Sequence, residues 1–103
     1  MELLQLQYFR VIARTQNISA AAAQLHISQP SLSQILKRLE QEAGGPLFDR
    51  VGKRIVLNAY GAVLLKHVEE VFTALNNAAS EIQTLRGTAS KTVNLSILSA
   101  SML

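Results

Sequence analysis

Amide and hydroxyl side chains are concentrated in residues 28–42, whose sequence reads SQPSLSQILKRLEQE. If this segment is a helix, its 3.6-residue period places a polar face opposite an apolar stripe. The polar face comprises Pro30, Ser33, Gln34, Lys37 and Gln41, and the apolar stripe comprises Leu32, Ile35, Leu36 and Leu39. Amides and hydroxyls can pair with base edges and lysine with phosphates, whereas a helix that faces only water more often carries alternating Glu and Lys.

Catalytic and metal-binding groups form no recognisable set. The two histidines, His26 and His67, are far apart in sequence, and the chain has no cysteine. No glycine-rich phosphate loop or nucleophile motif occurs. The sequence therefore predicts neither an enzyme nor a metal site, and no cofactor for these residues.

Positive charge is distributed unevenly along the chain. Residues 1–58 contain seven basic and four acidic residues, whereas residues 59–103 contain three of each, so the whole excess of +3 lies in the first part. A polyanion is expected to bind there, although +3 also fits an ordinary charged surface.

The composition is typical of one small folded domain, with 49% apolar and 17% charged residues in a chain of 103. No run of 18 uncharged apolar residues occurs, and the N-terminal MELLQLQYFR has no basic n-region or cleavage site. We therefore expect no membrane span and no secretory signal, and a cytoplasmic location.

Two short helices are predicted before residue 28. Apolar residues recur at helical spacing in LLQLQYFRVIAR, namely Leu6, Phe9, Ile12 and Ala13. This stripe leaves Gln7, Arg10 and Arg14 facing away from the core. Ser19 is then placed to cap AAAAQL, whose alanines allow another helix to approach closely.

The third helix has clear start and stop signals. Ser28 can cap it, and Pro30 falls in the first turn, where a missing N–H costs nothing. Gly44 is a plausible C-terminal stop. Because only His26 and Ile27 separate it from the second helix, the two form a helix-turn-helix.

A small hairpin follows in PLFDRVGKRIVL, residues 46–57, with a turn around Gly52. Three of the five residues from 50 to 54 are cationic, namely Arg50, Lys53 and Arg54. A basic hairpin next to a helix-turn-helix is typical of a wing, although a solvated charged turn has the same composition.

One long helix is predicted for residues 59–86, capped by Asn58. An unbroken a/d heptad seam runs along it, consisting of Leu64, Val68, Val71, Leu75, Ala78, Ile82 and Leu85. A second stripe, Leu65, Phe72 and Ala79, runs beside it. One stripe can serve a partner helix while the other rests on the chain's own helices, so we expect a coiled-coil homodimer.

The C-terminal residues 87–103 read as a small polar hinge followed by an apolar strand, VNLSILSASML. A lone strand has no sheet to join, so we expect it to be the first strand of a missing C-terminal domain.

The stretch ISAAAAQLHISQPSLSQILKRLEQEAGGPLFDRVGKRIVLNAYGAVLL resembles the N-terminal domain of LysR-type transcriptional regulators, and the match extends over about residues 3–97. The residues that carry the resemblance are Ser19, Ala21, Ala22, Leu25, Ser28, Gln29, Pro30, Leu32, Ser33, Leu39, Glu40, Gly44, Leu47, Phe48, Arg50, Leu57 and Gly61. The resemblance implies a bacterial, sequence-specific regulator of transcription with a winged helix-turn-helix and a dimerising linker helix. It also implies a C-terminal domain that binds a small-molecule effector, a tetrameric full-length protein and interrupted inverted repeats in double-stranded DNA.

The resemblance also implies contacts for individual residues. Base contacts are expected for Gln29, Pro30, Ser33 and Gln34, and backbone contacts for Ser19, Ser31, Lys37, Arg50, Lys53 and Arg54. The sequence departs from the family pattern at three positions. Gln34 stands where arginine is common, which favours adenine over guanine. Gly45 replaces an aliphatic residue, which would loosen the wing, and Asn58 replaces a threonine, which should be neutral.

The sequence thus predicts a mainly α protein. Residues 1–58 form a winged helix-turn-helix DNA-binding domain, residues 59–86 a linker helix, and residues 87–103 a hinge and a first strand of the effector domain. The alternative is a non-catalytic coiled-coil dimerisation or protein-interaction module, which explains the heptads but not the segregated charge or the amide-rich third helix.

Overall fold

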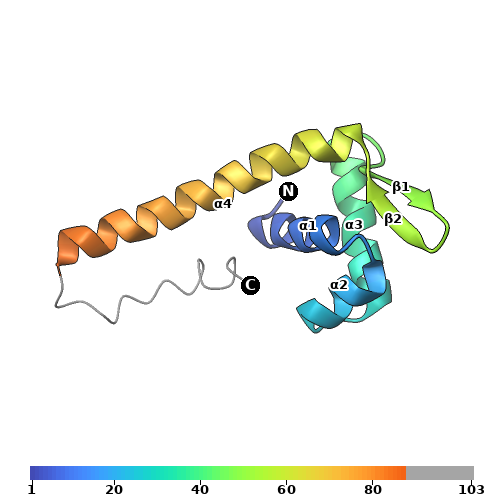
Figure 1. Ribbon diagram of the computed structural model, residues 1–103, viewed down its shortest axis with the longest axis horizontal. Helices are drawn as coiled ribbons and strands as arrows, with labels where there is room; N and C mark the ends of the chain where they lie inside the picture. The colour runs from blue at the N-terminus through green and yellow to red at the C-terminus, as the bar shows by residue number, and fades with distance from the viewer. Residues whose placement is uncertain (88–103) are drawn as a thin grey trace. The chain divides into compact units, whose positions relative to one another are not determined.

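The computed structural model describes residues 1–87, which form four helices and one antiparallel pair of strands (Figure 1). In chain order the elements are α1 (Leu3–Thr15), α2 (Ile18–Leu25), α3 (Gln29–Ala43), β1 (Phe48–Val51), β2 (Arg54–Leu57) and α4 (Ala59–Arg86). The predicted fold class is confirmed. The predicted strand within 93–103, and the hinge beyond Gly87, lie outside the described residues.

The chain divides into two units, one of residues 1–68 and one that begins at Glu69, and α4 contributes residues to both. In the first unit, α1, α2 and α3 contact one another. The core residues of these helices are Phe9, Val11, Ile12, Ala13, Ile18, Ala21, Ala22, Leu32, Leu36 and Leu39. The buried alanines of α2 allow the close approach of helices that the sequence predicted.

Two predictions for the first two helices are wrong. Ser19 is not the cap of α2, because the helix begins at Ile18 and the Asn17 side chain accepts the Ala20 N–H at 2.9 Å. Gln7 and Arg10 do not face water, since they are only 4% and 7% exposed. Helix α1 contacts both α2 and α3, so more than one of its sides is covered.

The predicted ends of α3 are confirmed. Ser28 caps the helix, Pro30 lies in its first turn, and Gly44 ends it with a φ of +99°. The turn before it begins at His26, which takes a left-handed conformation as the C-cap of α2. Leu32, Leu36 and Leu39 are buried, whereas Ile35 is only half-buried.

Strands β1 and β2 pair from Phe48↔Leu57 to Val51↔Arg54, which leaves Gly52 and Lys53 as a two-residue turn. Gly52 has a φ of +62°, a conformation that such tight hairpin turns require. Buried Phe48 and Ile55 hold the base of the hairpin, and the Phe48 ring lies 5.6 Å from that of Phe9. Figure 1 shows the hairpin projecting away from α1, α2 and α3.

The junction between the hairpin and α4 is tightly built. Asn58 caps α4 by accepting the Gly61 N–H at 2.8 Å, as the sequence predicted, and its Nδ2 donates to the Pro46 carbonyl at 3.0 Å. The Asn58 N–H donates to the Leu47 carbonyl at 3.1 Å. A Cβ atom on Gly61 would lie 2.2 Å from that carbonyl oxygen, so only glycine fits at this position in the first turn of α4.

The two apolar stripes of α4 are not divided into one buried stripe and one exposed stripe, as was expected from the sequence. Val68 of the heptad seam and Phe72 of the second stripe are both buried, and they lie four residues apart on one side of the helix. The remaining seam residues keep exposed surface, partial at Leu64 and Leu75 and larger at Val71, Ala78, Ile82 and Leu85. Val68 therefore has little surface left for a partner helix, while the rest of the seam is accessible.

Candidate nucleic-acid interface

The start of α3 is fixed by a small hydroxyl network. The Ser28 Oγ accepts the Ser31 N–H at 3.2 Å and donates to the Ser31 Oγ at 2.8 Å. Together with Pro30 in the first turn, this network sets the residue at which the helix begins and hence the direction in which each later side chain points. The cap is thus part of the geometry of the exposed face.

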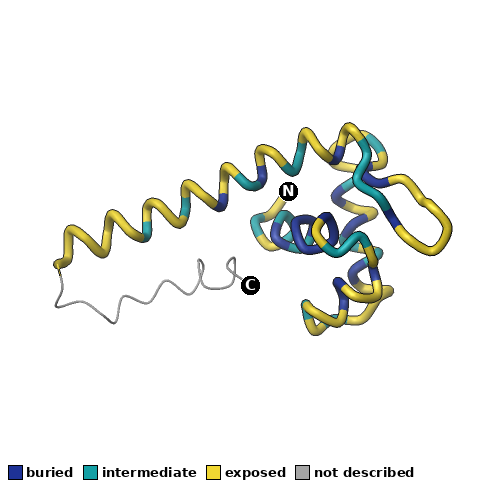
Figure 2. The backbone as a smooth tube through the Cα atoms, viewed as in Figure 1, coloured by how far each residue is buried: buried dark blue, intermediate teal, exposed yellow. Residues whose placement is uncertain are grey.

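That exposed face carries the polar residues that the sequence singled out. Gln29, Pro30, Ser31, Gln34 and Lys37 are exposed, and Ser33 is half-buried. Figure 2 shows both buried and exposed positions along α3, and the buried ones are Leu32, Leu36 and Leu39. The structure therefore presents all six predicted residues of α3 at least partly to solvent, on a rigid element.

Negative charge is kept away from this face. Residues 29–39 contain no acidic residue, and the two acids that follow are held by other partners. The Glu40 carboxylate accepts the Leu47 N–H at 2.7 Å, and the Glu42 carboxylate pairs with the N-terminal amine at 3.0 Å. The front of α3 therefore offers hydrogen-bonding groups and cations without a carboxylate that would repel an anion.

Ser19 and Gln29, which come from different helices, are brought together. The Ser19 Oγ donates to the Gln29 Oε1 at 3.2 Å, and both residues are exposed. The sequence placed both residues at the interface but did not predict this contact. Their spacing of ten residues is no recognisable signal before the turn between α2 and α3 is known.

The three wing cations do not share one face of the hairpin. Directly paired residues of antiparallel strands lie on the same face, so Arg50 shares the face of Phe48 and Ile55, whereas Arg54 lies on the other. Lys53 occupies the turn, and all three cations are exposed. The hairpin tip therefore carries positive charge on both sides and at its end.

The base of the hairpin is anchored to the helices. The Ile55 N–H donates to the carbonyl of Gln16, the C-cap of α1, at 3.4 Å, and Leu47 is buried. These contacts join the wing to the helices, and the looser wing that the sequence predicted from Gly45 stays a prediction. A Cβ atom added at Gly45 would meet nothing within 4 Å.

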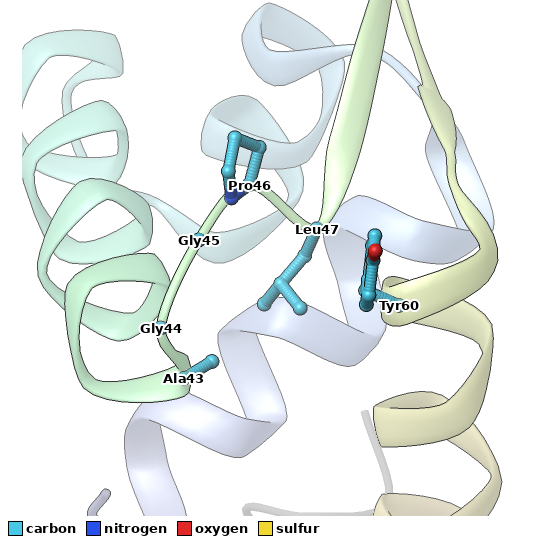
Figure 3. A pocket seen from close by; sticks show the side chains of 6 residues that line it. All are labelled: Ala43, Gly44, Gly45, Pro46, Leu47 and Tyr60. Carbon is cyan, nitrogen blue, oxygen red and sulfur yellow. The ribbon is translucent and has the colours of Figure 1, made fainter.

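A pocket of about 340 Å³ lies beside the loop between α3 and β1 (Figure 3). It is lined by Ala43, Gly44, Gly45, Pro46, Leu47 and Tyr60. It contains no histidine and no carboxylate. Across residues 1–87, no three His, Asp or Glu side chains gather in a set that could hold a metal ion. In the same residues no helix is both long and apolar enough to cross a membrane.

Arg38 is a cation that the site prediction left out. It is exposed on α3 directly after Lys37 and thus adds to the positive charge near the polar face. The charge count of the third helix could have included it, but the face defined by the 3.6-residue period did not.

The fold and the exposed polar helix together define a winged helix-turn-helix protein. The family model of the bacterial regulatory helix-turn-helix proteins of the lysR family matches residues 3–62, and the chain belongs to this family. The resemblance seen in the sequence is thereby confirmed, and residues 3–62 are the helix-turn-helix region that this family shares.

Two relatives of known sequence are HTH-type transcriptional regulators of Bacillus subtilis. YybE is 45% identical over 85 residues, which cover 82% of this chain and 29% of YybE. BsdA is 45% identical over 87 residues, which cover 84% of this chain and 30% of BsdA. The chain thus spans less than a third of the length of these regulators.

Two similar solved structures contain DNA. The DNA-binding domain of CbnR in complex with DNA has a TM-score of 0.75 at 30% identity, and the match covers 84% of this chain and 99% of that one. The DNA-binding domain of BenM with benA site 1 DNA has a TM-score of 0.77 at 26% identity, covering 85% of this chain and 99% of that one.

Proposed function

We propose that this chain binds double-stranded DNA sequence-specifically as the DNA-binding part of a dimeric bacterial transcriptional regulator. Helix α3 enters the major groove, which is about 12 Å wide and accepts one helix. The observation that carries the proposal is the exposed face of α3, which is rich in amides and hydroxyls and free of carboxylates over residues 29–39. The solved DNA complexes of similar domains support this arrangement.

Side-chain chemistry and exposure support a role for each of the predicted residues. Base edges are read by the residues at the front of α3, namely Gln29, Pro30, Ser33 and Gln34. Phosphates and the adjacent groove are contacted by Ser31, Lys37, Arg50, Lys53 and Arg54. At Gln34 the amide can pair with adenine N6 and N7, whereas the arginine common in the family would pair with guanine. This position therefore shifts base preference.

The wing supplies electrostatic affinity. Arg50, Lys53 and Arg54 are exposed and point to different sides of the hairpin, so they can follow the backbone of the groove next to α3. Each phosphate that is neutralised releases counterions, so the logarithm of the binding constant falls with the logarithm of salt concentration in proportion to the number of contacts.

A salt titration tests this assignment. Replacement of all three wing cations by alanine should weaken binding to every duplex and reduce the salt slope by about 2–3. The control is Lys66→Ala with Arg86→Ala, which removes two exposed cations of α4 outside the interface. An unchanged slope in the wing variant would refute the wing assignment. Absence of binding at low salt would instead favour the coiled-coil interaction module.

Dimerisation through α4 is supported by its accessible heptad seam. Exposed surface remains at Leu64, Val71, Leu75, Ala78, Ile82 and Leu85, which recur with heptad spacing, whereas Val68 is buried in the chain itself. The Leu85 side chain is 89% exposed, an unusual environment for leucine at the end of such a seam. A second copy of α4 would cover this surface.

The relatives also support a proposal for the whole protein. The chain covers about 30% of YybE and of BsdA. Within a full-length regulator, a C-terminal domain would bind a small-molecule effector, and two dimers would assemble into a tetramer on an interrupted inverted repeat. A protein that acts on bacterial promoters works in the cytoplasm.

A further inference from the structure

The hydrogen bond between Ser19 and Gln29 connects the start of α2 to the start of the recognition helix. The hydroxyl of Ser19 donates to Oε1 of Gln29 over 3.2 Å, and both residues are exposed. A glutamine at the first position of a helix has three free torsions, so this contact restricts an otherwise flexible amide before any DNA is bound.

We propose that Ser19 is a positioning residue that orients the Gln29 amide and so determines which base edge Gln29 accepts. This inference rests on the proposed function, in which Gln29 reads bases. It assigns to Ser19 a part in sequence preference, in place of the phosphate contact that family resemblance implies.

Ser19 cannot fill both roles at once, because its hydroxyl has a single proton to donate. A phosphate oxygen can only accept a hydrogen bond. While the Ser19 proton is donated to Oε1 of Gln29, it is not available for a phosphate. The phosphate contact would therefore require this bond to break, and removal of the hydroxyl should affect base preference rather than general affinity.

The orientation of Gln29 has a defined chemical consequence. With Oε1 turned to Ser19, the Nε2 group and its two donors are directed away from Ser19. These donors suit base edges that offer acceptors, such as O6 and N7 of guanine or O4 of thymine, and oppose cytosine, which offers the N4 donor. The bidentate pair with adenine needs an accepting Oε1, which the Ser19 bond already occupies in part.

Selection from a random duplex pool tests the proposal in the intact chain. The position that Gln29 reads is the one at which Gln29→Ala removes the base preference. At that position the wild type should disfavour cytosine. Ser19→Ala should lower the ratio between the best and worst base at that pair by about 2–10-fold, the size of one hydrogen bond, with more adenine accepted. Ser19→Thr keeps the hydroxyl and should retain the wild-type preference. Gln24→Ala, an exposed amide on α2, is the matched control.

The double variant shows whether Ser19 acts through Gln29. In the Gln29→Ala background, Ser19→Ala should change neither the preference nor the affinity further. An equal loss of affinity for all duplexes in Ser19→Ala, with unchanged preference, would overturn the proposal in favour of a phosphate contact. If wild type selects no sequence at all, the proposed function itself fails, which is a different result from selection that Ser19→Ala leaves unchanged.

Discussion

The packing at Gly61 gives a quantitative prediction for the junction between the wing and α4. An alanine Cβ at this position would lie 2.2 Å from the carbonyl oxygen of Leu47 and 2.6 Å from Cδ1 of Leu57. Such contacts are not seen below 3.0 Å, so the backbone would have to move by about 0.8 Å at the oxygen. The oxygen belongs to the backbone and also accepts the Asn58 N–H, so it cannot simply rotate away.

The expected cost of Gly61→Ala combines three effects. Overpacking of a tight site costs about 1–3 kcal/mol. Displacement of the Gly61 N–H from the Asn58 cap adds about 1 kcal/mol. The better helix propensity of alanine returns up to about 1 kcal/mol. The free energy of unfolding should therefore fall by about 1–4 kcal/mol in total.

Urea unfolding followed by circular dichroism at a fixed protein concentration measures this change. Gly45→Ala is the matched control, because a Cβ there meets nothing within 4 Å and its φ is not positive. That variant should be neutral or more stable by up to about 1 kcal/mol. Equal stability of the two variants would refute the conclusion that the start of α4 is sterically fixed by Leu47.

Two further predictions concern the ends of the same helix. Asn58→Ala should lower the free energy of unfolding by about 0.5–2 kcal/mol in the same urea assay, since the cap is lost; Asn58→Asp, which keeps the accepting oxygen, should lose less, and equal losses would contradict the capping role. Ile82→Asp should raise the dimer dissociation constant at least about 100-fold by placing an unpaired carboxylate in the seam, as measured by sedimentation equilibrium. Ser80→Asp, an exposed position off the seam, should leave it unchanged, and equal effects would argue against this interface.

Local signals predicted the ends of α3 and the start of α4 correctly. Ser28, Pro30, Gly44 and Asn58 act through their own backbone or through groups three residues away, so the sequence alone contains the information. The hairpin turn at Gly52 was predictable for the same reason.

The wrong predictions came from effects that a single helix cannot reveal. Asn17 and Ser19 are both good caps two residues apart, and the burial of Ile18 decides between them, because α2 must already be helical at Ile18. Gln7 and Arg10 are buried because α1 contacts both α2 and α3, whereas the period of one helix indicates only one covered side. Similarly, the heptad pattern of α4 did not reveal that Val68 is buried within the chain.

The sequence predicted which residues of the site are exposed, but not which of them contact one another. The period of α3 placed Gln34 and Lys37 correctly on its exposed face. The bond from Ser19 to Gln29 depends on the angle between α2 and α3, which is set by the left-handed turn at His26. The position of Arg50 and Arg54 on opposite faces likewise depends on the strand register.

The position of α3 in the major groove can be tested by cross-linking. The chain has no cysteine, so Gln34→Cys provides a single thiol on the exposed face of α3. Duplexes of the selected site would carry a disulfide tether either on cytosine N4, in the major groove, or on guanine N2, in the minor groove. Ser80→Cys on α4 is the control. If α3 lies in the major groove, Gln34→Cys should cross-link to the major-groove tether only; a cross-link to the minor-groove tether alone would contradict this placement.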